Sequence, residues 1–290
     1  MRSAVIERGD VPVWDVARPA RPSRLAGVSM AGFRDRGSAR AGHRAIPHPA
    51  VTLVLEFGDR PLIVADGAGR QLQGNLVAGL GFGAGGFHVR GEKFAAVQVR
   101  LSPLVARAIL GVSPADLGGA VAALDDLWGA QAPRICEQLS VASSWEERFA
   151  LTDALLARGC QAGPSVDPEV AWAWEQILRS QGQVRVDRLA GEVGWSRKRL
   201  WSRFHSQVGL PPKRAATLVR FDHAAHRLAA GEETARVAAD AGYADQSHLH
   251  REVVAFTSAT PATVAGEPWL AVDDLAWPDR RRARYPHPDG

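Results

Sequence analysis

Residues 189–209 read LAGEVGWSRKRLWSRFHSQVG, and residues 237–256 read VAADAGYADQSHLHREVVAF. In each stretch an alanine precedes a glycine by four residues, Ala190 before Gly194 and Ala238 before Gly242, and a polar segment follows. A small side chain lets two helices cross closely, and glycine accepts the left-handed turn that ends the first of them. The two stretches therefore predict two helix-turn-helix units that read DNA.

Charge is distributed unevenly over these units, although the net charge of the chain is only +4. Residues 231–261 carry five acids and two bases, a balance of −3. Residues 193–221 carry no acid and seven bases, namely Arg197, Lys198, Arg199, Arg203, Lys213, Arg214 and Arg220. Because concentrated positive charge attracts phosphate, we expect the first unit to anchor the complex and the second to contribute base discrimination.

Length and composition indicate an ordinary globular protein. The 290 residues, 46% of them hydrophobic, suffice for two domains with cores of their own. No apolar run approaches the roughly 20 residues of a membrane helix, and the first residues lack the apolar core of a signal peptide. Cys136 and Cys160 have no CxxC spacing, which predicts neither a disulfide framework nor a zinc site. We expect a cytoplasmic protein.

The first hundred residues have the pattern of β-structure. Strands are predicted over 51–57, 62–65, 75–80 and 94–101, separated by glycine-containing turns. In the last of them Val97, Val99 and Leu101 alternate with Gln98 and Arg100, as in a half-buried strand. Short strands of this kind favour an antiparallel barrel or sandwich.

Helices are predicted after residue 101, and their start signals place the domain boundaries. Ser102-Pro103 and Ser144 open helices that end at Gly111 and near Gly159, and Asp167-Pro168 opens the first helix of a second domain. The predicted organisation begins with a β-rich sensing or dimerisation domain with trailing helices over residues 1–160 and a linker over 161–166. A DNA-binding domain follows over 167–266, and a loosely ordered tail over 267–290.

The second half of the chain resembles the AraC/XylS family of transcription regulators. The matching positions are Leu189-Ala190, Gly194-Trp195-Ser196, Arg197-Lys198-Arg199, Leu200, Phe204, Gly209, Pro212, Arg220, Gly242-Tyr243-Ala244-Asp245-Gln246-Ser247-His248 and Thr260-Pro261. Ser258 stands where the family usually has glycine. The resemblance implies a two-domain α+β fold, with an N-terminal antiparallel β-barrel or cupin-like domain and a C-terminal all-α double helix-turn-helix domain.

Candidate DNA contacts of the first unit lie around its second helix. Ser196 is the expected N-cap, directing backbone N–H groups toward a phosphate. Leu200 and Phe204 should face the core, which leaves Arg197, Lys198, Trp201 and Ser202 for the groove and Arg199 and Arg203 for the flanking backbone. For Trp201, packing against the following helix is an equally good interpretation.

The second unit offers Gln246, Ser247, His248, His250 and Arg251 as candidate DNA contacts. Glutamine can hydrogen-bond adenine, and serine or arginine suits phosphate or guanine. A helix predicted from Pro212 to about Ala230 joins the units and is about 28 Å long at 1.5 Å per residue. This length suits recognition helices that enter adjacent major-groove segments about 34 Å apart.

Other interpretations of the chain remain open at this stage. One is a barrel-type enzyme fused to a helix-turn-helix unit, and another is an interaction protein that does not bind DNA. His43, His48 and His88 lack the close His-x-His spacing of a cupin metal site, so no catalytic, cofactor or metal residue is predicted. The expected partners are double-stranded DNA, a small-molecule effector in the barrel, and a second copy through helices around Arg107, Arg134 and Gly159, with no membrane.

Overall fold

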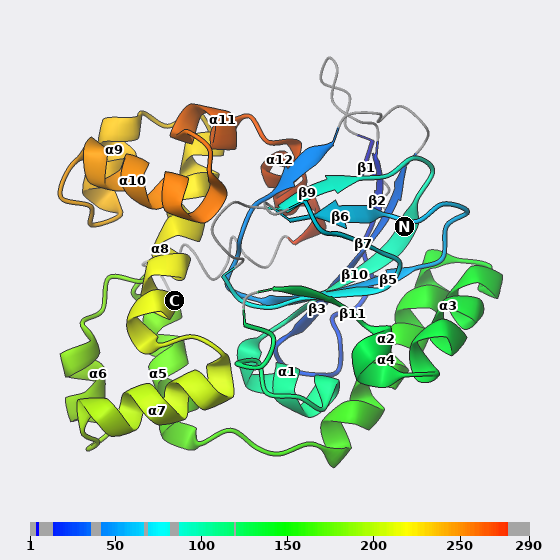
Figure 1. Cartoon of the computed structure of the whole chain (residues 1–290), viewed down its shortest axis with the longest axis horizontal. Coiled ribbons are helices and arrows are strands. Elements are labelled where there is room, and N and C mark those ends of the chain that lie inside the picture. The colour runs from blue at the N-terminus through cyan, green and yellow to red at the C-terminus, as the bar shows by residue number, and fades with distance from the viewer. Residues whose placement is uncertain are drawn as a thin grey trace.

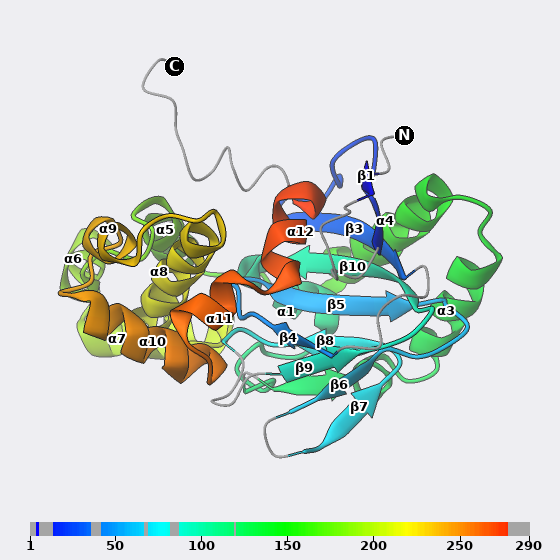
Figure 2. The same cartoon turned by 90° about the horizontal axis from the view of Figure 1, so that it is seen from above.

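The computed structural model describes residues 4–5, 14–35, 42–66, 69–81, 87–118 and 120–277. A domain built on β-sheets lies beside a domain of helices, and further helices pack on the outside of the sheets (Figures 1 and 2). The predicted two-domain α+β fold, with antiparallel sheets in the N-terminal half and helices in the C-terminal half, is confirmed.

Two antiparallel sheets form the N-terminal domain. One has the strand order β1-β2-β3-β10-β5-β8-β11 and the other β4-β9-β6-β7. The strands are β1 (Ala4–Val5), β2 (Trp14–Ala17), β3 (Val28–Asp35), β4 (His43–Ala45), β5 (Val51–Glu56), β6 (Ile63–Ala65), β7 (Gln71–Gln73), β8 (Leu76–Ala78), β9 (Phe87–Arg90), β10 (Ala95–Leu101) and β11 (Val121–Ala123). The four strands predicted from the sequence correspond to β5, β6, β8 and β10.

Strand β10 lies between β3 and β5 and is buried on both faces, so the prediction of a half-buried strand is wrong. Val97, Val99 and Leu101 pack toward the helices that cover the large sheet. The alternate residues Gln98 and Arg100 face the space between the two sheets instead of solvent. The alternation of apolar and polar residues is real, but its polar side lines the interior of the barrel.

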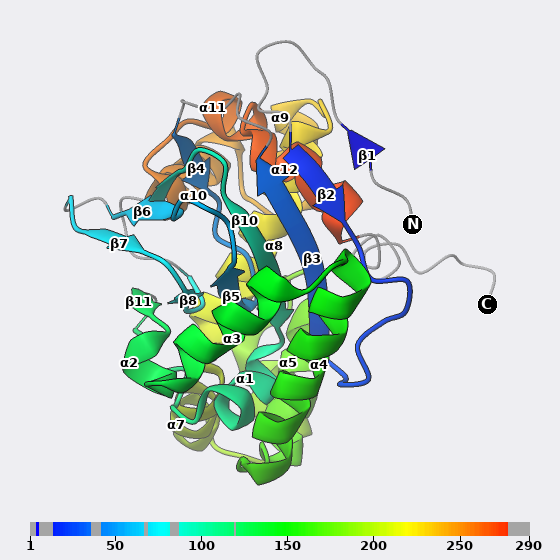
Figure 3. The same cartoon turned by 90° about the vertical axis from the view of Figure 1, so that its right-hand side faces the viewer.

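Helices α1 (Pro103–Leu110), α2 (Asp125–Trp128), α3 (Gln131–Val141) and α4 (Trp145–Ala162) complete the N-terminal domain. Figure 3 shows α3 and α4 lying across one face of the large sheet. The predicted caps are present, since Ser102 and Ser144 accept hydrogen bonds from backbone N–H groups of the first turns of α1 and α4. The ring of Trp145 fills the space beside Gly32 on β3, where any Cβ would clash with it.

The C-terminal domain is built around the 18-residue helix α8. Its helices are α5 (Pro168–Arg179), α6 (Val186–Glu192), α7 (Arg197–Val208), α8 (Pro212–Ala229), α9 (Thr234–Asp240), α10 (Gln246–Thr257) and α11 (Pro261–Ala265). Two helix pairs, α6 with α7 and α9 with α10, lie near opposite ends of α8 (Figure 1).

Residues 268–276 form helix α12 (Pro268–Ala276), which packs back onto the barrel, so the prediction of a loose tail is wrong for this segment. The ring of Trp269 stacks on that of Trp14 at 4.1 Å between centroids. Arg100 on β10 donates two hydrogen bonds to Asp273, at 2.7 and 3.1 Å. The basic run Arg280–Arg284 lies outside the described residues.

The two domains share a continuous hydrophobic core, which includes Leu53 on β5 and Phe204 on α7. Gly209, at the end of α7, approaches Pro114 so closely that a Cβ there would lie 2.9 Å from its atoms. Ser113 Oγ donates a hydrogen bond of 2.7 Å to the carbonyl of Ser206. Because these contacts use the C-terminal half of α7, its first turns stay free.

The segment between the predicted domains begins within a helix, because α4 continues through Ala162. Helix α5 begins at Pro168 after Asp167, as the sequence predicts. The domain limits at 160, 167 and 266 stay predictions.

Glu56, at the end of β5, gives a prediction on stability. Burial raises the pKa of its carboxyl to about 7, while the N–H of Leu62 donates to Oε1 at 2.6 Å. A folded-state pKa above the unfolded value of about 4.3 means that the contribution of Glu56 is complete below about pH 4 and is lost as the pH rises through 7. Glu56→Gln keeps the acceptor and should raise the free energy of unfolding by about 1–2 kcal/mol at pH 8. Urea unfolding at pH 8 and pH 5 checks this, and an equal gain at both pH values would contradict it.

Ser258, which follows α10, gives a second prediction. It adopts a left-handed conformation with φ of 52°, and its N–H donates to the carbonyl of Val254. L-residues with a Cβ are strained there, whereas glycine is not. Ser258→Gly should therefore stabilise the protein by about 0.5–1 kcal/mol. Ser258→Ala is the control and should give no gain, so equal urea midpoints for the glycine variant and the unmodified chain would refute the argument.

Candidate nucleic-acid interface

The first helix-turn-helix unit has the geometry expected from its sequence. Gly194, between α6 and α7, has φ of +67°, and the N–H of Trp195 donates to the carbonyl of Ala190 at 2.9 Å. Ser196 caps α7 by accepting a hydrogen bond from the N–H of Arg199 at 3.2 Å. Leu200 and Phe204 are fully buried. The opposite face of α7 is therefore turned to solvent.

All the candidate contacts of the first unit are exposed, but their cations are not equally free. Arg203 makes a bidentate pair with Asp167 at 2.7 and 2.8 Å. Arg197 pairs with Asp187 at 3.0 Å while its side chain stays 76% exposed. The remaining members, Ser196, Lys198, Arg199, Trp201 and Ser202, are also exposed. The predicted residues are thus all accessible to solvent along the first half of α7.

Trp201 lies on the open surface of α7. The residue is 51% exposed, and its ring stacks on that of His205 in the same helix at 5.2 Å between centroids. It is not packed into the following helix, which was the alternative left open by the sequence. An exposed, pre-oriented indole can meet a thymine methyl group in a groove.

The second unit repeats this geometry. Gly242 has φ of +74°, and Asp245 caps α10 by accepting a hydrogen bond of 2.7 Å from the N–H of His248. Gln246, Ser247, His250 and Arg251 are exposed.

His248 differs from the other candidates of the second unit because it is half-buried. Its Nδ1 accepts a hydrogen bond from the N–H of Ala244 at 3.3 Å, and its ring meets that of Tyr243 edge-on. The imidazole therefore braces the turn between α9 and α10.

Helix α8 holds the second unit through a buried ion pair. Arg220 pairs with Glu252 on α10, and the guanidinium lies 4.5 Å from the centroid of the Tyr243 ring. The hydroxyl of Tyr243 donates to Glu252 at 2.6 Å, and burial together with the Glu252 charge raises the pKa of this phenol. Arg220, which the sequence counts among the cations of the first unit, is therefore a structural residue.

The turn before α6 also ties the two units together. Gly182 lies so close to α8 that a Cβ would come within 2.1 Å of the carbonyl oxygen of Ala216. Gln183 Nε2 donates to the carbonyl of Asp240 on α9 at 3.1 Å. The relative position of the units is thus fixed by contacts on both sides of α8.

Helix α8 lies between α7 and α10 along its length in Figure 1, and Figure 2 shows α7 and α10 on the same side of α8. With 18 residues, α8 is about 27 Å long. The arrangement therefore presents two polar helices to one side of the domain, near opposite ends of α8.

An open groove between the units contains cations that the sequence analysis did not assign. It has a volume of about 560 Å³, and its lining includes Arg185, Asp187, Arg197, Lys213 and Thr217. Lys213 was counted in the acid-free stretch without a role, and Arg185 precedes that stretch. Only the turn of the chain before α6 brings them together, so sequence spacing could not reveal this groove.

The net positive charge around the first unit is smaller than its seven basic residues suggest. Arg197, Arg203 and Arg220 are paired with Asp187, Asp167 and Glu252, all of which come from outside residues 193–221. Arg199 and Arg214 lie over the rings of Trp195 and Phe256 at 4.4 and 4.3 Å. Within the described part of the chain, Lys198, Arg199, Lys213 and Arg214 make no ion pair.

The histidines that suggested a cupin metal site do not gather. His48 Nε2 lies 2.9 Å from Thr52 Oγ1, and His43 meets the edge of Trp14. His88 is exposed on β9. No group of three or more His, Cys, Asp or Glu suited to a metal ion occurs among the residues that could be placed. In the same residues, no helix has the length and apolar character needed to cross a membrane.

Residues 189–266 match the family described as a helix-turn-helix domain. ToxT from Vibrio cholerae O395 is similar over 83% of this chain and 98% of its own, at 10% identity and a TM-score of 0.45. The C-terminal domain of AraT, a response regulator from Geobacillus stearothermophilus, is similar over 34% of this chain and 85% of its own, at 19% identity and a TM-score of 0.33. The AraC-like transcriptional activator CuxR is similar over 70% and 83%, at 15% identity and a TM-score of 0.28.

No curated protein matches the sequence. The domain match covers both helix-turn-helix units, and it confirms the resemblance drawn from their residues. Residues 189–266 therefore form a helix-turn-helix domain, as their sequence predicts.

Proposed function

We propose that the protein is a sequence-specific transcription regulator of the AraC type. One chain reads two adjacent major-groove segments of duplex DNA, with α7 in one and α10 in the other. The observation that carries this proposal is the display of both helices on one side of α8 (Figure 2), with α10 held there by the Arg220–Glu252 pair. A major groove about 12 Å wide accepts one α-helix, and successive grooves on one face of the duplex recur about every 34 Å.

In the first groove, Arg197 and Lys198 are placed to donate to guanine O6 and N7. Trp201 and Ser202 extend the same surface by about one turn of α7. Arg199 and Arg203 flank it and suit the phosphate backbone. Because the Arg197–Asp187 pair is mostly exposed, it contributes little free energy and yields readily to a phosphate or a base.

In the second groove, Gln246 is the candidate for adenine, and Ser247 and Arg251 are candidates for phosphate or guanine. His250 lies on the exposed side of α10. His248 supports this surface through the turn that it braces. With few cations, α10 gains discrimination from hydrogen bonds more than affinity from charge.

The groove between the units suits the sugar-phosphate backbone that separates the two major-groove segments. Arg185, Arg197 and Lys213 line it, and it lies between α7 and the turn at Gly242. Cations at this point neutralise phosphates without reading the sequence.

Control by a small molecule completes the proposed function, because the barrel contains a cavity of about 130 Å³ between its two sheets. Such a regulator works where chromosomal DNA is, in the cytoplasm. A homodimer through the outer helices around Arg107, Arg134 and Gly159 would let two chains bind paired sites.

A gel-shift assay with the DNA upstream of the protein's own gene tests the proposed function, and binding is the expected result. If the protein binds neither that DNA nor any site found by genome-wide mapping, the alternative of an interaction protein is favoured.

The unequal charge of the two units gives a prediction. Arg197→Gln with Lys198→Gln should lower affinity for the operator about 100-fold, because each removes a charged base contact of about 1–3 kcal/mol. Arg251→Gln should lower it less than about tenfold. Titrations at one fixed salt concentration measure both losses. Arg179→Gln, an exposed arginine of α5, is the control, and comparable losses for the two units would refute the asymmetry.

The groove gives a separate prediction. Lys213→Gln should weaken binding to operator and to unrelated DNA by similar factors, because a phosphate contact carries no sequence information. The slope of log affinity against log salt should fall by about one. Lys213→Arg should restore both values. A loss confined to the operator, or an unchanged salt slope, would show that Lys213 does not contact phosphate.

A further inference from the structure

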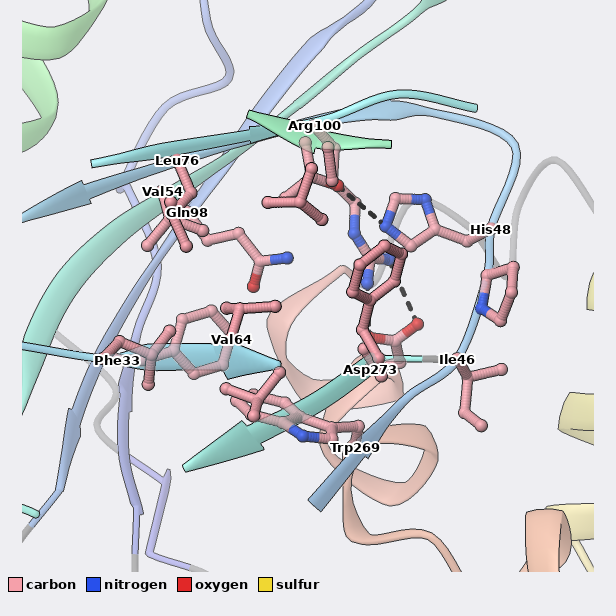
Figure 4. A pocket seen from close by; sticks show the side chains of 18 of the residues that line it. Phe33, Ile46, His48, Val54, Val64, Leu76, Gln98, Arg100, Trp269 and Asp273 are labelled. Atoms are coloured by element: carbon pink, nitrogen blue, oxygen red, sulfur yellow. Dashed lines mark hydrogen bonds and ion pairs between the residues drawn. The ribbon is translucent and has the colours of Figure 1, made fainter. Parts of the chain in front are cut away.

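The cavity of the barrel is lined mainly by apolar side chains. Figure 4 shows Phe33, Val54, Val64 and Leu76 from the two sheets around it, and Trp269 of α12 closes one side. Cavities of about this volume can hold molecules of the size of benzene. The volume of about 130 Å³ therefore sets the ligand at roughly one ring.

Gln98 is the polar group at the middle of this cavity. Its side chain extends from β10 into the open space (Figure 4). It makes no hydrogen bond to another residue in the described ranges. The residue is only half-buried, and its amide can both donate and accept hydrogen bonds, so it can bind a polar group of a ligand in this space.

The charges at the edge of the cavity are compensated within the protein. Asp273 on α12 accepts two hydrogen bonds from Arg100, and its Oδ2 lies 3.2 Å from Nε2 of His226 on α8. The Arg100 guanidinium also lies 4.4 Å from the centroid of the Trp277 ring. An anionic ligand would have to separate this buried pair, which is strongly unfavourable.

We propose that the cavity binds a small, uncharged, largely apolar molecule of about one ring, whose single polar group hydrogen-bonds the amide of Gln98. This inference rests on the proposed control by a small molecule and names the class of that molecule. The walls supply the apolar contact, Gln98 supplies orientation, and the Arg100–Asp273 pair rejects negative charge.

The same cavity connects the ligand to the DNA-binding domain. Trp269 and Asp273 belong to α12, which follows the helix-turn-helix domain directly, and His226 lies on α8, between the two units. The ligand therefore touches or neighbours the elements that set the position of α7 and α10. Ligand binding in the cavity and DNA binding are then thermodynamically coupled. The ligand changes the affinity for DNA by the same factor by which DNA changes the affinity for the ligand.

The test uses the full-length protein with phenol as the neutral probe and benzoate as an anionic probe with the same ring. Calorimetric titration should show phenol binding at least tenfold more tightly than benzoate. Gln98→Leu should weaken phenol at least fivefold and leave toluene unchanged or tighter. Equal binding of benzoate and phenol, an unchanged phenol affinity in Gln98→Leu, or no binding of any probe would overturn the proposal.

A cavity-filling variant locates the site. Ala96→Leu, on the cavity side of β10, should abolish binding of both phenol and toluene, while circular dichroism checks that the fold is retained. If this variant does not fold, competition between toluene and phenol in the unmodified protein replaces it. Independent binding of the two molecules would then place phenol elsewhere and overturn the proposal.

Gel-shift titrations of the same samples separate this inference from the proposed function. Saturating phenol should change the affinity for the operator at least threefold, and an unchanged affinity would overturn the coupling. If the protein binds DNA but none of the probes, the inference about the ligand is wrong and the proposed function stands. If the protein binds the probes but no DNA, the proposed function is wrong and the class of ligand is still supported.

Discussion

The ion pair between Arg220 on α8 and Glu252 on α10 is the contact on which the DNA-binding arrangement depends. Its side chains are only 18% and 10% exposed. Taking two charges out of water costs several kcal/mol for each, and the cost is recovered only where geometry and hydrogen bonding are complete. Tyr243 supplies both, through its hydroxyl on Glu252 and its ring against Arg220. The pair fixes the orientation of α10 on α8, and hence relative to α7.

The helical domain could be predicted from the sequence because its determinants are local. A helix cap, a left-handed glycine and a small residue at a helix crossing each act within about five residues, so Ser196, Gly194 and Ala190 suffice to define the first unit. The second unit follows from Asp245, Gly242 and Ala238 in the same way. Ser258 is an exception, since it adopts a left-handed conformation that a serine does not predict.

The electrostatics and the barrel interior could not be predicted, because both depend on residues distant in sequence. Asp167, Asp187 and Glu252 reduce the field of the first unit only after the chain has folded. The alternation in β10 gave the correct two faces, but periodicity cannot say that the second face is covered by another sheet. For Gln98 and Arg100 this difference turns solvent-facing side chains into the polar lining of a cavity.

Helix α12 shows how the two domains depend on one another. It follows the helix-turn-helix domain in sequence, yet Trp269 and Asp273 complete a wall of the N-terminal barrel. This wall of the cavity is therefore present only while the C-terminal region is docked on the barrel. A molecule that fills it gains its apolar contacts from both domains at once and binds the docked arrangement better than any other. By linkage, its binding free energy is added to the stability of that arrangement. The last helix of the chain thereby makes the position of the DNA-binding domain sensitive to what the barrel contains.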